Sequence, residues 1–224
     1  MNEWRYLDFI VANGAMQMAL DEAIMIASRE GKVPNTVRFY AFKEPVTTIG
    51  CHQDASEIKK PFVRRMTGGS AVFHNNDFTY SVVMRKKTKF FDEKDYYYIG
   101  NMILEGLKEM GVEATYSGKK YCKKDSNCYL NESPYDIEVE GKKISGNAQT
   151  TKGATLLQQG TIILNNSKIA LPDRNMDVVV GKMKVGFQKH LEKNNCFLKK
   201  GRLTRYEKRL AEQLYKEKYV LEKN

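Results

Sequence analysis

Three short segments of the sequence hold residue types that could do chemistry, and the first is Arg64–His74. It combines two adjacent arginines with the hydroxyl of Thr67 and the pair Gly68 and Gly69. Guanidinium groups, together with backbone N–H groups that glycines leave accessible, suit a phosphate or a carboxylate. The spacing matches neither the Walker phosphate loop nor the dinucleotide fingerprint GxGxxG. A tight turn after a solvated arginine pair, with His74 as a partly buried polar residue, is the alternative.

The second segment is Gly141–Gln149, which contains the adjacent lysines Lys142 and Lys143. Neighbouring residues of a strand point to opposite faces, so one of these lysines would face inward. Ile144 shares a face with Lys142, but the nearby glycines favour a bulge that could redirect these side chains. From the residues alone the pattern favours a pair of surface lysines, and a buried lysine that faces a ligand pocket is the alternative.

The third segment is Asn127–Leu130, where Cys128 lies in a polar, lysine-rich connection. Four lysines just upstream would favour the thiolate form of this cysteine if they lie close to it. A thiolate could accept an acyl group, with His74 or Lys143 as its partner. From the residues alone, an inert loop thiol is favoured. The cysteines form no CxxC pair and have no histidine at a zinc-ligand spacing, so we expect no metal site.

The hydrophobic pattern predicts the strands and helices that must position these segments. A capping box of Thr204 and Glu207 predicts the start of the last helix, whose buried face is expected to carry three residues: Tyr206, Leu210 and Leu214. The predicted fold class is α+β, with a mixed, mostly antiparallel sheet flanked by helices. The other predicted helices are Ala15–Glu30, Asp95–Met110 and 177–192, and the predicted strands are Trp4–Phe9, Thr36–Tyr40, Val46–Ile49, Ser70–Phe73, Phe78–Met84, Tyr135–Val139, Lys143–Ala148 and Ala154–Leu164.

The charge of the 224-residue chain is concentrated at its C-terminal end. The formal net charge is +10, and residues 181–224 alone carry 13 basic and five acidic residues. Because the rest of the chain is nearly neutral and no RRM, KH or zinc-finger pattern accompanies this end, we do not expect a nucleic-acid partner. No apolar run reaches the roughly 20 residues that cross a bilayer, and no signal peptide is visible. We therefore expect a cytoplasmic protein without a membrane partner.

In their order and spacing, the three segments resemble the lipoate–protein ligase and octanoyltransferase family, which shares its catalytic domain with biotin–protein ligases. The resemblance implies a single catalytic domain of this type over residues 1–224, with a basic C-terminal segment at 181–224 and no large accessory domain. It rests on these matches: Trp4–Asp8, Met18–Ala23, Val37–Tyr40, Ile49-Gly50, Arg64–Gly69, Ala71–His74, Thr79–Ser81, Tyr135–Ile137, Gly141–Gln149, Gly160–Leu164 and Ala211–Tyr219.

The resemblance also implies roles for single residues. Lys143 matches a lysine that contacts the acyl carbonyl, so the resemblance reverses the interpretation above and places its side chain in the pocket. Cys128, followed by Tyr129 and then Ser133-Pro134, is similar to the nucleophile of the transferase subgroup. Ser70 departs from the glycine or arginine usual at its position. The residues implied to hold the acyl chain and its activated intermediate are Arg65, Thr67, Gly68, Gly69, His74, Gly146 and Ala148.

The function that follows from the resemblance is protein lipoylation. An octanoyl or lipoyl group would pass from an acyl carrier protein to Cys128, and then to a lysine of a lipoyl-domain protein such as the glycine-cleavage H protein or a 2-oxoacid dehydrogenase E2 subunit. This route needs no cofactor. The alternative is the catalytic subunit of a lipoate–protein ligase, which would use ATP and Mg²⁺ and need a separate accessory protein. The basic segment 181–224 would steer acidic carriers and acceptors toward the enzyme.

Overall fold

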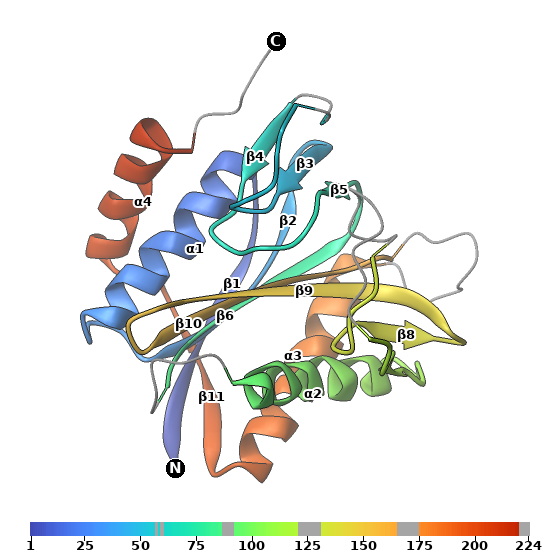
Figure 1. Cartoon of the computed structure of the whole chain (residues 1–224). Coiled ribbons are helices and arrows are strands. Elements are labelled where there is room, and N and C mark those ends of the chain that lie inside the picture. Colours follow the sequence, from blue (N-terminus) through green and yellow to red (C-terminus); the bar gives the residue numbers. More distant parts are fainter. Residues whose placement is uncertain (57, 59–60, 87–91, 121–130, 165–174, 220–224) are drawn as a thin grey trace.

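The computed structural model describes residues 1–56, 58, 61–86, 92–120, 131–164 and 175–219, and it contains two sheets (Figure 1). The larger sheet has the strand order β11-β1-β2-β6-β10-β9-β8-β7, and the smaller has the order β4-β3-β5. The strands are β1 (Asn2–Ala12), β2 (Asn35–Phe42), β3 (Val46–Ile49), β4 (Phe62–Arg64), β5 (Val72–His74), β6 (Phe78–Arg85), β7 (Thr115–Tyr116), β8 (Ile137–Val139), β9 (Lys142–Lys152), β10 (Thr155–Ile162) and β11 (Cys196–Gly201). The helices are α1 (Gly14–Arg29), α2 (Glu93–Glu109), α3 (Met176–Lys193) and α4 (Arg205–Glu217).

The large sheet is mixed and mostly antiparallel. Strand β1 pairs in parallel with both β2 and β11, whereas every neighbouring pair from β2 to β7 is antiparallel. Helices flank this sheet, so the predicted fold class is confirmed.

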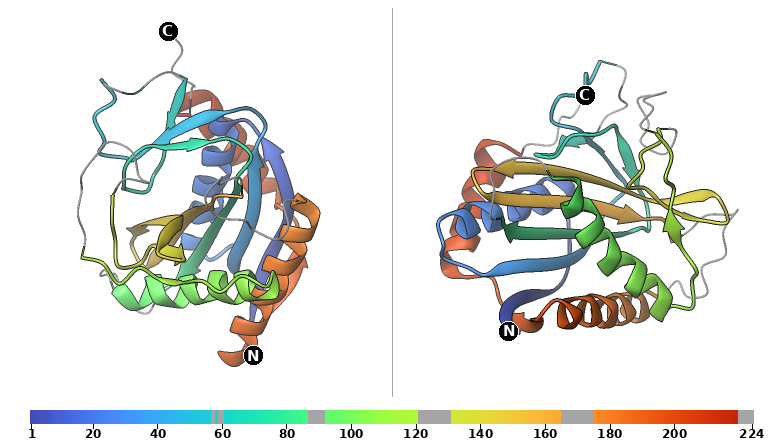
Figure 2. Two further views of the ribbon diagram at one scale, coloured as in Figure 1. Left: turned by 90° about the vertical axis from the view of Figure 1, so that its right-hand side faces the viewer. Right: turned by 60° about the horizontal axis from the view of Figure 1, so that its bottom comes forward.

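Two helices cover each face of the large sheet, with α1 and α4 on one side and α2 and α3 on the other (Figures 1 and 2). Successive residues of the central strands point to opposite faces. In β6, Val82 packs in the core under α2 and α3, while Val83 packs against α1. Leu156 and Leu157 of β10 divide in the same way. The central strands are therefore buried on both faces, and polar side chains on them must find partners inside the protein.

Three strands that the sequence pattern did not predict are β4, β7 and β11. Strands β4 and β7 have three and two residues, too short to show an alternating pattern. Strand β11 follows the long helix α3 and pairs with β1, at the other end of the sequence. Its identity as a strand depends on that distant partner, which a local pattern does not reveal.

The buried face of α4 is confirmed in part. Leu210 and Leu214, both half-buried, pack against the core beside the buried Ala211, whereas the half-buried ring of Tyr206 lies under the ammonium group of Lys32. The capping box of Thr204 and Glu207 is present as predicted. Glu207 also accepts hydrogen bonds from Arg5 of β1, at 2.5 and 2.9 Å, and this buried ion pair turns the carboxylate toward the sheet.

The basic C-terminal segment forms α3, β11 and α4. Four of its lysines make exposed ion pairs with acidic residues of neighbouring elements, and exposed pairs of this kind add little stability. Their charge stays at the surface, and a steering role for this segment stays a prediction. These pairs are Lys189–Glu109, Lys193–Glu105, Lys199–Glu3 and Lys200–Asp8. No helix in the described part of the chain is long and apolar enough to cross a membrane.

Candidate functional site

A cavity of about 430 Å³, open at one side, lies between the start of α1, the small sheet, and strands β6, β9 and β10. Five of the residues expected to hold an acyl chain line it. They are Arg65, Gly69, His74, Gly146 and Ala148.

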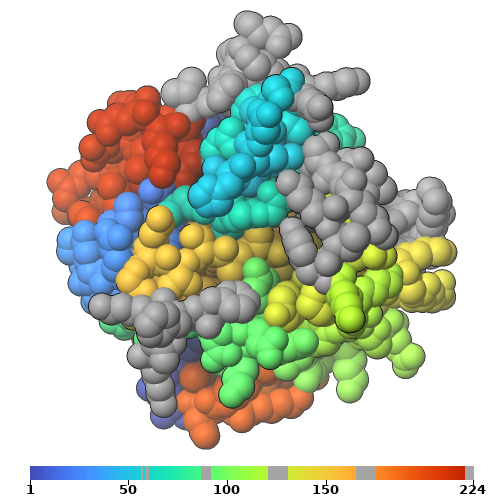
Figure 3. Space-filling model, in the orientation of Figure 1, coloured from blue at the N-terminus to red at the C-terminus, as the bar shows by residue number. Residues whose placement is uncertain are grey.

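A second cavity adjoins the first and contains Lys143. The two share three lining residues, Gly69, Asn147 and Ala148, so a ligand could extend from one into the other. Gly68 lines this second cavity, while Thr67 is fully buried behind both. In the space-filling view, the yellow surface of β9 and β10 lies between the cyan and teal residues of the small sheet and the green residues of α2 (Figure 3).

Arg65 shapes the segment from Thr67 to Ser70, which we call the glycine loop. Its guanidinium donates to the carbonyl oxygens of Gly68 at 2.9 Å and Ser70 at 3.1 Å. It also donates to both oxygens of Thr48, each at 2.8 Å. Gly69 has a φ of +85°, a conformation that side chains with a Cβ rarely adopt. A buried arginine and a glycine together therefore hold the loop against the cavity.

His74 is held from both sides of its ring. Its Nδ1 lies 2.5 Å from Asp77 Oδ2, and its Nε2 lies 2.9 Å from Thr48 Oγ1. A carboxylate only accepts hydrogen bonds, so Nδ1 carries a proton toward Asp77. Both ring nitrogens are thus engaged, which favours a role in shaping the cavity wall over the alternative of a base for Cys128.

Lys143 turns inward, in the orientation that the resemblance implies. The pairing of β8 with β9 shifts register here, since Ile137 lies opposite Ser145 but Glu138 lies opposite Lys143. Ile144 enters the core, so the neighbouring Lys143 points to the opposite face of β9, where its side chain, only 11% exposed, faces the second cavity. Lys142 is exposed.

The ammonium group of Lys143 is fixed by acceptors on one segment. Its Nζ lies 2.8 Å from Asp136 Oδ2 and donates to the carbonyl oxygen of Asn131 at 3.1 Å. Burial raises the pKa of the Asp136 carboxyl, and the positive charge of Lys143 opposes that shift. Asp136 also accepts a hydrogen bond from the backbone N–H of Ser133. The arrangement places a held cation in the wall of the second cavity.

Many of the residues around the first cavity are polar by type, but their polar atoms bond to one another. Thr79 Oγ1 lies 3.3 Å from Thr161 Oγ1, and the hydroxyl of Tyr80 donates to Asn147 Oδ1. A Cβ atom on residue 160 would overlap both the Tyr80 hydroxyl and Asn147 Oδ1, so glycine is required at this position. With their hydroxyls paired, these side chains can present carbon to the cavity, as an alkyl chain requires.

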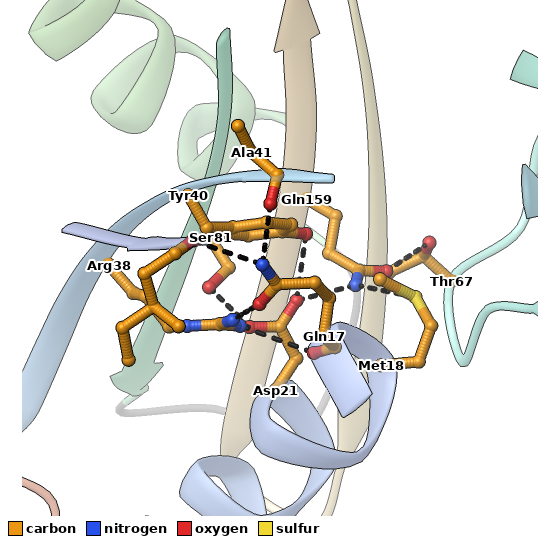
Figure 4. Close-up of polar contacts among 10 residues, drawn as sticks. Gln17, Met18, Asp21, Arg38, Tyr40, Ala41, Thr67, Ser81 and Gln159 are labelled. Atoms are coloured by element: carbon orange, nitrogen blue, oxygen red, sulfur yellow. Dashed lines mark hydrogen bonds and ion pairs between the residues drawn. The ribbon is translucent and has the colours of Figure 1, made fainter. Parts of the chain in front are cut away.

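A buried polar network beneath the glycine loop connects it to α1 and β2 (Figure 4). Gln159 accepts a hydrogen bond from Thr67 Oγ1 at 2.8 Å and donates to Asp21 Oδ2 at 2.7 Å. Asp21 forms an ion pair with Arg38 at 2.5 Å, and both side chains are 1% exposed. The hydroxyls of Tyr40 and Ser81 also donate to Asp21.

Sequence reasoning did not identify Asp21, Gln159, Asn131 or Asp136 as part of the site. Asp21 and Asp136 lie inside segments that carried the resemblance, yet their pattern showed only a helix and an alternating strand. Cys128 and the predictions made for it lie outside the described residues. In the described part of the chain, no group of three or more histidine, cysteine, aspartate or glutamate residues converges to hold a metal ion.

Comparison with known proteins is consistent with this geometry. A family model described as the lipoyl protein ligase A/B catalytic domain matches residues 13–196. The chain belongs to this family. The first cavity, the glycine loop and Lys143 all fall within the matched residues of this lipoyl protein ligase A/B domain.

Two relatives in the family are octanoyltransferases. Octanoyltransferase LipM of Moorella thermoacetica is 37% identical over 177 residues, which cover 72% of this chain and 65% of that protein. The chain thus spans less than two thirds of that relative. Octanoyltransferase LipM of Clostridioides difficile is 31% identical, with 98% of this chain and 97% of that protein covered.

Solved structures of the family show the same fold. A lipoate-protein ligase A bound with ATP superimposes with a TM-score of 0.82 at 22% identity, covering 99% of this chain and 97% of the ligase. At this identity the likeness establishes the fold of the lipoyl protein ligase A/B domain and not the reaction.

Proposed function

We propose that this protein transfers an octanoyl group, or a lipoyl group, to a lysine of lipoyl-domain proteins through an acyl-enzyme on Cys128. The observation that carries the proposal is Lys143, a cation held in the wall of the second cavity, which shares Gly69, Asn147 and Ala148 with the first, carbon-lined cavity. The octanoyltransferase relatives favour this acyl donor over free lipoate. Two statements stay predictions: residues 1–224 form a single catalytic domain, and the protein is cytoplasmic.

The cavities suggest how an acyl thioester would bind. With its carbonyl near Lys143, the alkyl chain would pass Gly69 and Ala148, which line both cavities, and end among the residues that line only the first. The residues at that far end include Met18, Tyr40 and Phe42. Lys143 would then stabilise the negative charge that develops on the carbonyl oxygen during attack.

Two attacks complete the reaction. The thiolate of Cys128 attacks the carbonyl carbon and a new C–S bond forms. The C–S bond to the carrier breaks, and the departing carrier thiolate takes up the proton that Cys128 lost on ionising. The neutral ε-amine of the acceptor lysine then attacks the acyl-enzyme, an amide forms, and the cysteine recovers the proton that the amine loses. Because an amide is more stable than a thioester, this route needs no ATP. We propose acyl carrier protein as the donor, and the glycine-cleavage H protein or an E2 lipoyl domain as the acceptor.

The test is mass spectrometry of the purified protein after incubation with octanoyl carrier protein. We expect an octanoyl adduct on Cys128 that disappears when a lipoyl domain is added, and no adduct or transfer in Cys128→Ser. Cys51→Ser, at a half-buried thiol in the described part of the chain, is the matched control and should keep both the adduct and the transfer. Transfer that persists in Cys128→Ser would contradict the acyl-enzyme. Adenylate formation from lipoate and ATP, unaffected by the cysteine change, would instead identify an ATP-dependent lipoate ligase that needs Mg²⁺ and a separate accessory protein.

Met18 is predicted to limit the length of the acyl chain. Its side chain is 2% exposed, and Gln159 Nε2 lies 3.4 Å from its sulfur, which fixes the thioether in the wall of the first cavity. Met18→Ala should raise the rate with decanoyl relative to octanoyl carrier protein by about tenfold, because added methylenes gain space. Competition between the two donors, read by mass spectrometry of the acceptor, measures this ratio. Met16→Ala is the control on the same helix, and an unchanged ratio in Met18→Ala would place the end of the chain elsewhere.

A further inference from the structure

One hydrogen bond joins two parts of the site that lie far apart in the sequence. The side-chain amide of Asn131 donates to the hydroxyl of Ser70 at 2.6 Å, across 61 residues. Both residues are buried, with 8% and 7% of their surface exposed. Ser70 ends the glycine loop, and Asn131 lies close to Lys143 in the wall of the second cavity.

The same asparagine also contacts Lys143. Its carbonyl oxygen accepts a hydrogen bond from Lys143 Nζ at 3.1 Å, on the ammonium group that pairs with Asp136. Asn131 therefore bonds to the glycine loop through its side chain and to the lysine through its main chain. Asn131 is thus a direct link between the loop and the lysine, beside the bond from Thr67 to Gln159 on β10, the strand next to β9.

The neighbouring contacts show that the segment beyond Asn131 is held independently of Ser70. The backbone N–H of Ser133 donates to Asp136, and the side chain of Asn147 donates to the carbonyl oxygen of Tyr135. The ring of Tyr135 stacks on Tyr96 of α2, with centroids 4.3 Å apart. Loss of the Ser70 bond would leave these contacts in place and release mainly the end of the segment that carries Asn131.

We propose that Ser70 and Asn131 are positioning residues, whose hydrogen bond sets the place of the Lys143 ammonium group relative to the glycine loop. The proposal rests on the proposed function, since it assigns a consequence to the position of Lys143 during acyl transfer. The expected consequence is selective. A displaced lysine stabilises the developing negative charge less well, whereas most residues around the alkyl chain lie on α1, β2, β9 and β10 and persist.

The test is a double-mutant cycle on the rate of acyl-enzyme formation from octanoyl carrier protein. Ser70→Ala and Asn131→Ala should each lower kcat by about 10- to 100-fold, with KM changed by less than about threefold. The double variant should be no slower than the slower single variant, because both changes remove the same bond. Ser70→Thr keeps the hydroxyl and should recover most of kcat. Ser56→Ala, which removes an exposed hydroxyl that bonds to Asp54, is the matched control and should leave both constants unchanged.

Three results would overturn the proposal: effects that multiply in the double variant, a loss that appears in KM instead of kcat, or single variants with wild-type kcat. Thermal unfolding of each variant separates positioning from folding, because a purely structural bond would lower Tm and leave kcat of the folded enzyme unchanged. Ser70→Thr keeps the test decisive if Ser70→Ala does not fold. A wild-type protein that transfers no acyl group would refute the proposed function itself, whereas an active wild type with an additive cycle would refute this inference alone.

Discussion

Replacing Lys143 with alanine is expected to lower kcat for acyl transfer by about 10²–10³-fold, the usual cost of removing a group that stabilises a developing oxyanion. The reason is geometric, because this ammonium group lies in the second cavity, which adjoins the carbon-lined one, and is held there by Asp136 and Asn131. Single-turnover formation of the octanoyl adduct on Cys128, followed by mass spectrometry, measures the effect.

Lys142→Ala supplies the matched control for this prediction. Lys142 is the preceding residue of the same strand, but its side chain is exposed and does not line either cavity. We expect wild-type rates from it. Removal of Lys143 also leaves the Asp136 carboxylate buried without this cation, so circular dichroism should confirm that the variant is folded. A folded Lys143→Ala protein that keeps more than about a tenth of the wild-type kcat would exclude the role proposed for this lysine.

Replacing Asp21 with alanine is expected to lower the free energy of unfolding by about 3–5 kcal/mol, because it leaves the buried charge of Arg38 without its partner. The change also removes the acceptor for the hydroxyls of Tyr40 and Ser81 and for the amide of Gln159. Equilibrium unfolding in urea measures the difference. Since Gln159 also bonds to Thr67, the folded fraction of this variant should show a less well-positioned glycine loop and a lower kcat.

Asp8→Ala also removes one partner of an ion pair, but an exposed one. Comparing it with Asp21→Ala therefore shows how much of the lost free energy of unfolding comes from burial. Asp8 pairs with Lys200 at 2.8 Å, but the two side chains are 59% and 64% exposed. Screening by water makes such a pair worth about 1 kcal/mol or less. If Asp21→Ala and Asp8→Ala cost similar free energies, the buried network does not stabilise the fold in the way described.

The sequence predicted those parts of the fold whose signals are local. The helix α1 begins after Asn13, which caps its first turn, and the capping box of α4 begins at Thr204 as predicted. The strands β2, β3, β6 and β10 were found because their apolar residues form continuous or alternating runs. Strand β11 was missed because its partner β1 lies at the other end of the chain.

The candidate site likewise has parts that the sequence predicted and parts that it did not. Residue types and order were sufficient to select the glycine loop, Lys143 and Cys128, since their spacing along the chain is what a sequence records. The roles of these residues stay predictions. From the residues alone, the lysine pair was interpreted as a surface feature, and only the resemblance reversed that interpretation.

By itself, the sequence determined the family, the fold class and two of the segments that line the cavities, because their residue types and order can be read along the chain. Only the tertiary structure decided what Lys143 faces, since the second cavity lies on the face of β9 opposite Ile144. It alone revealed the links from Asp21 through Gln159 to Thr67, and from Ser70 through Asn131 to Lys143. Such bonds join residues 12 to 138 positions apart, and the burial that makes them matter arises only when the sheets and helices pack.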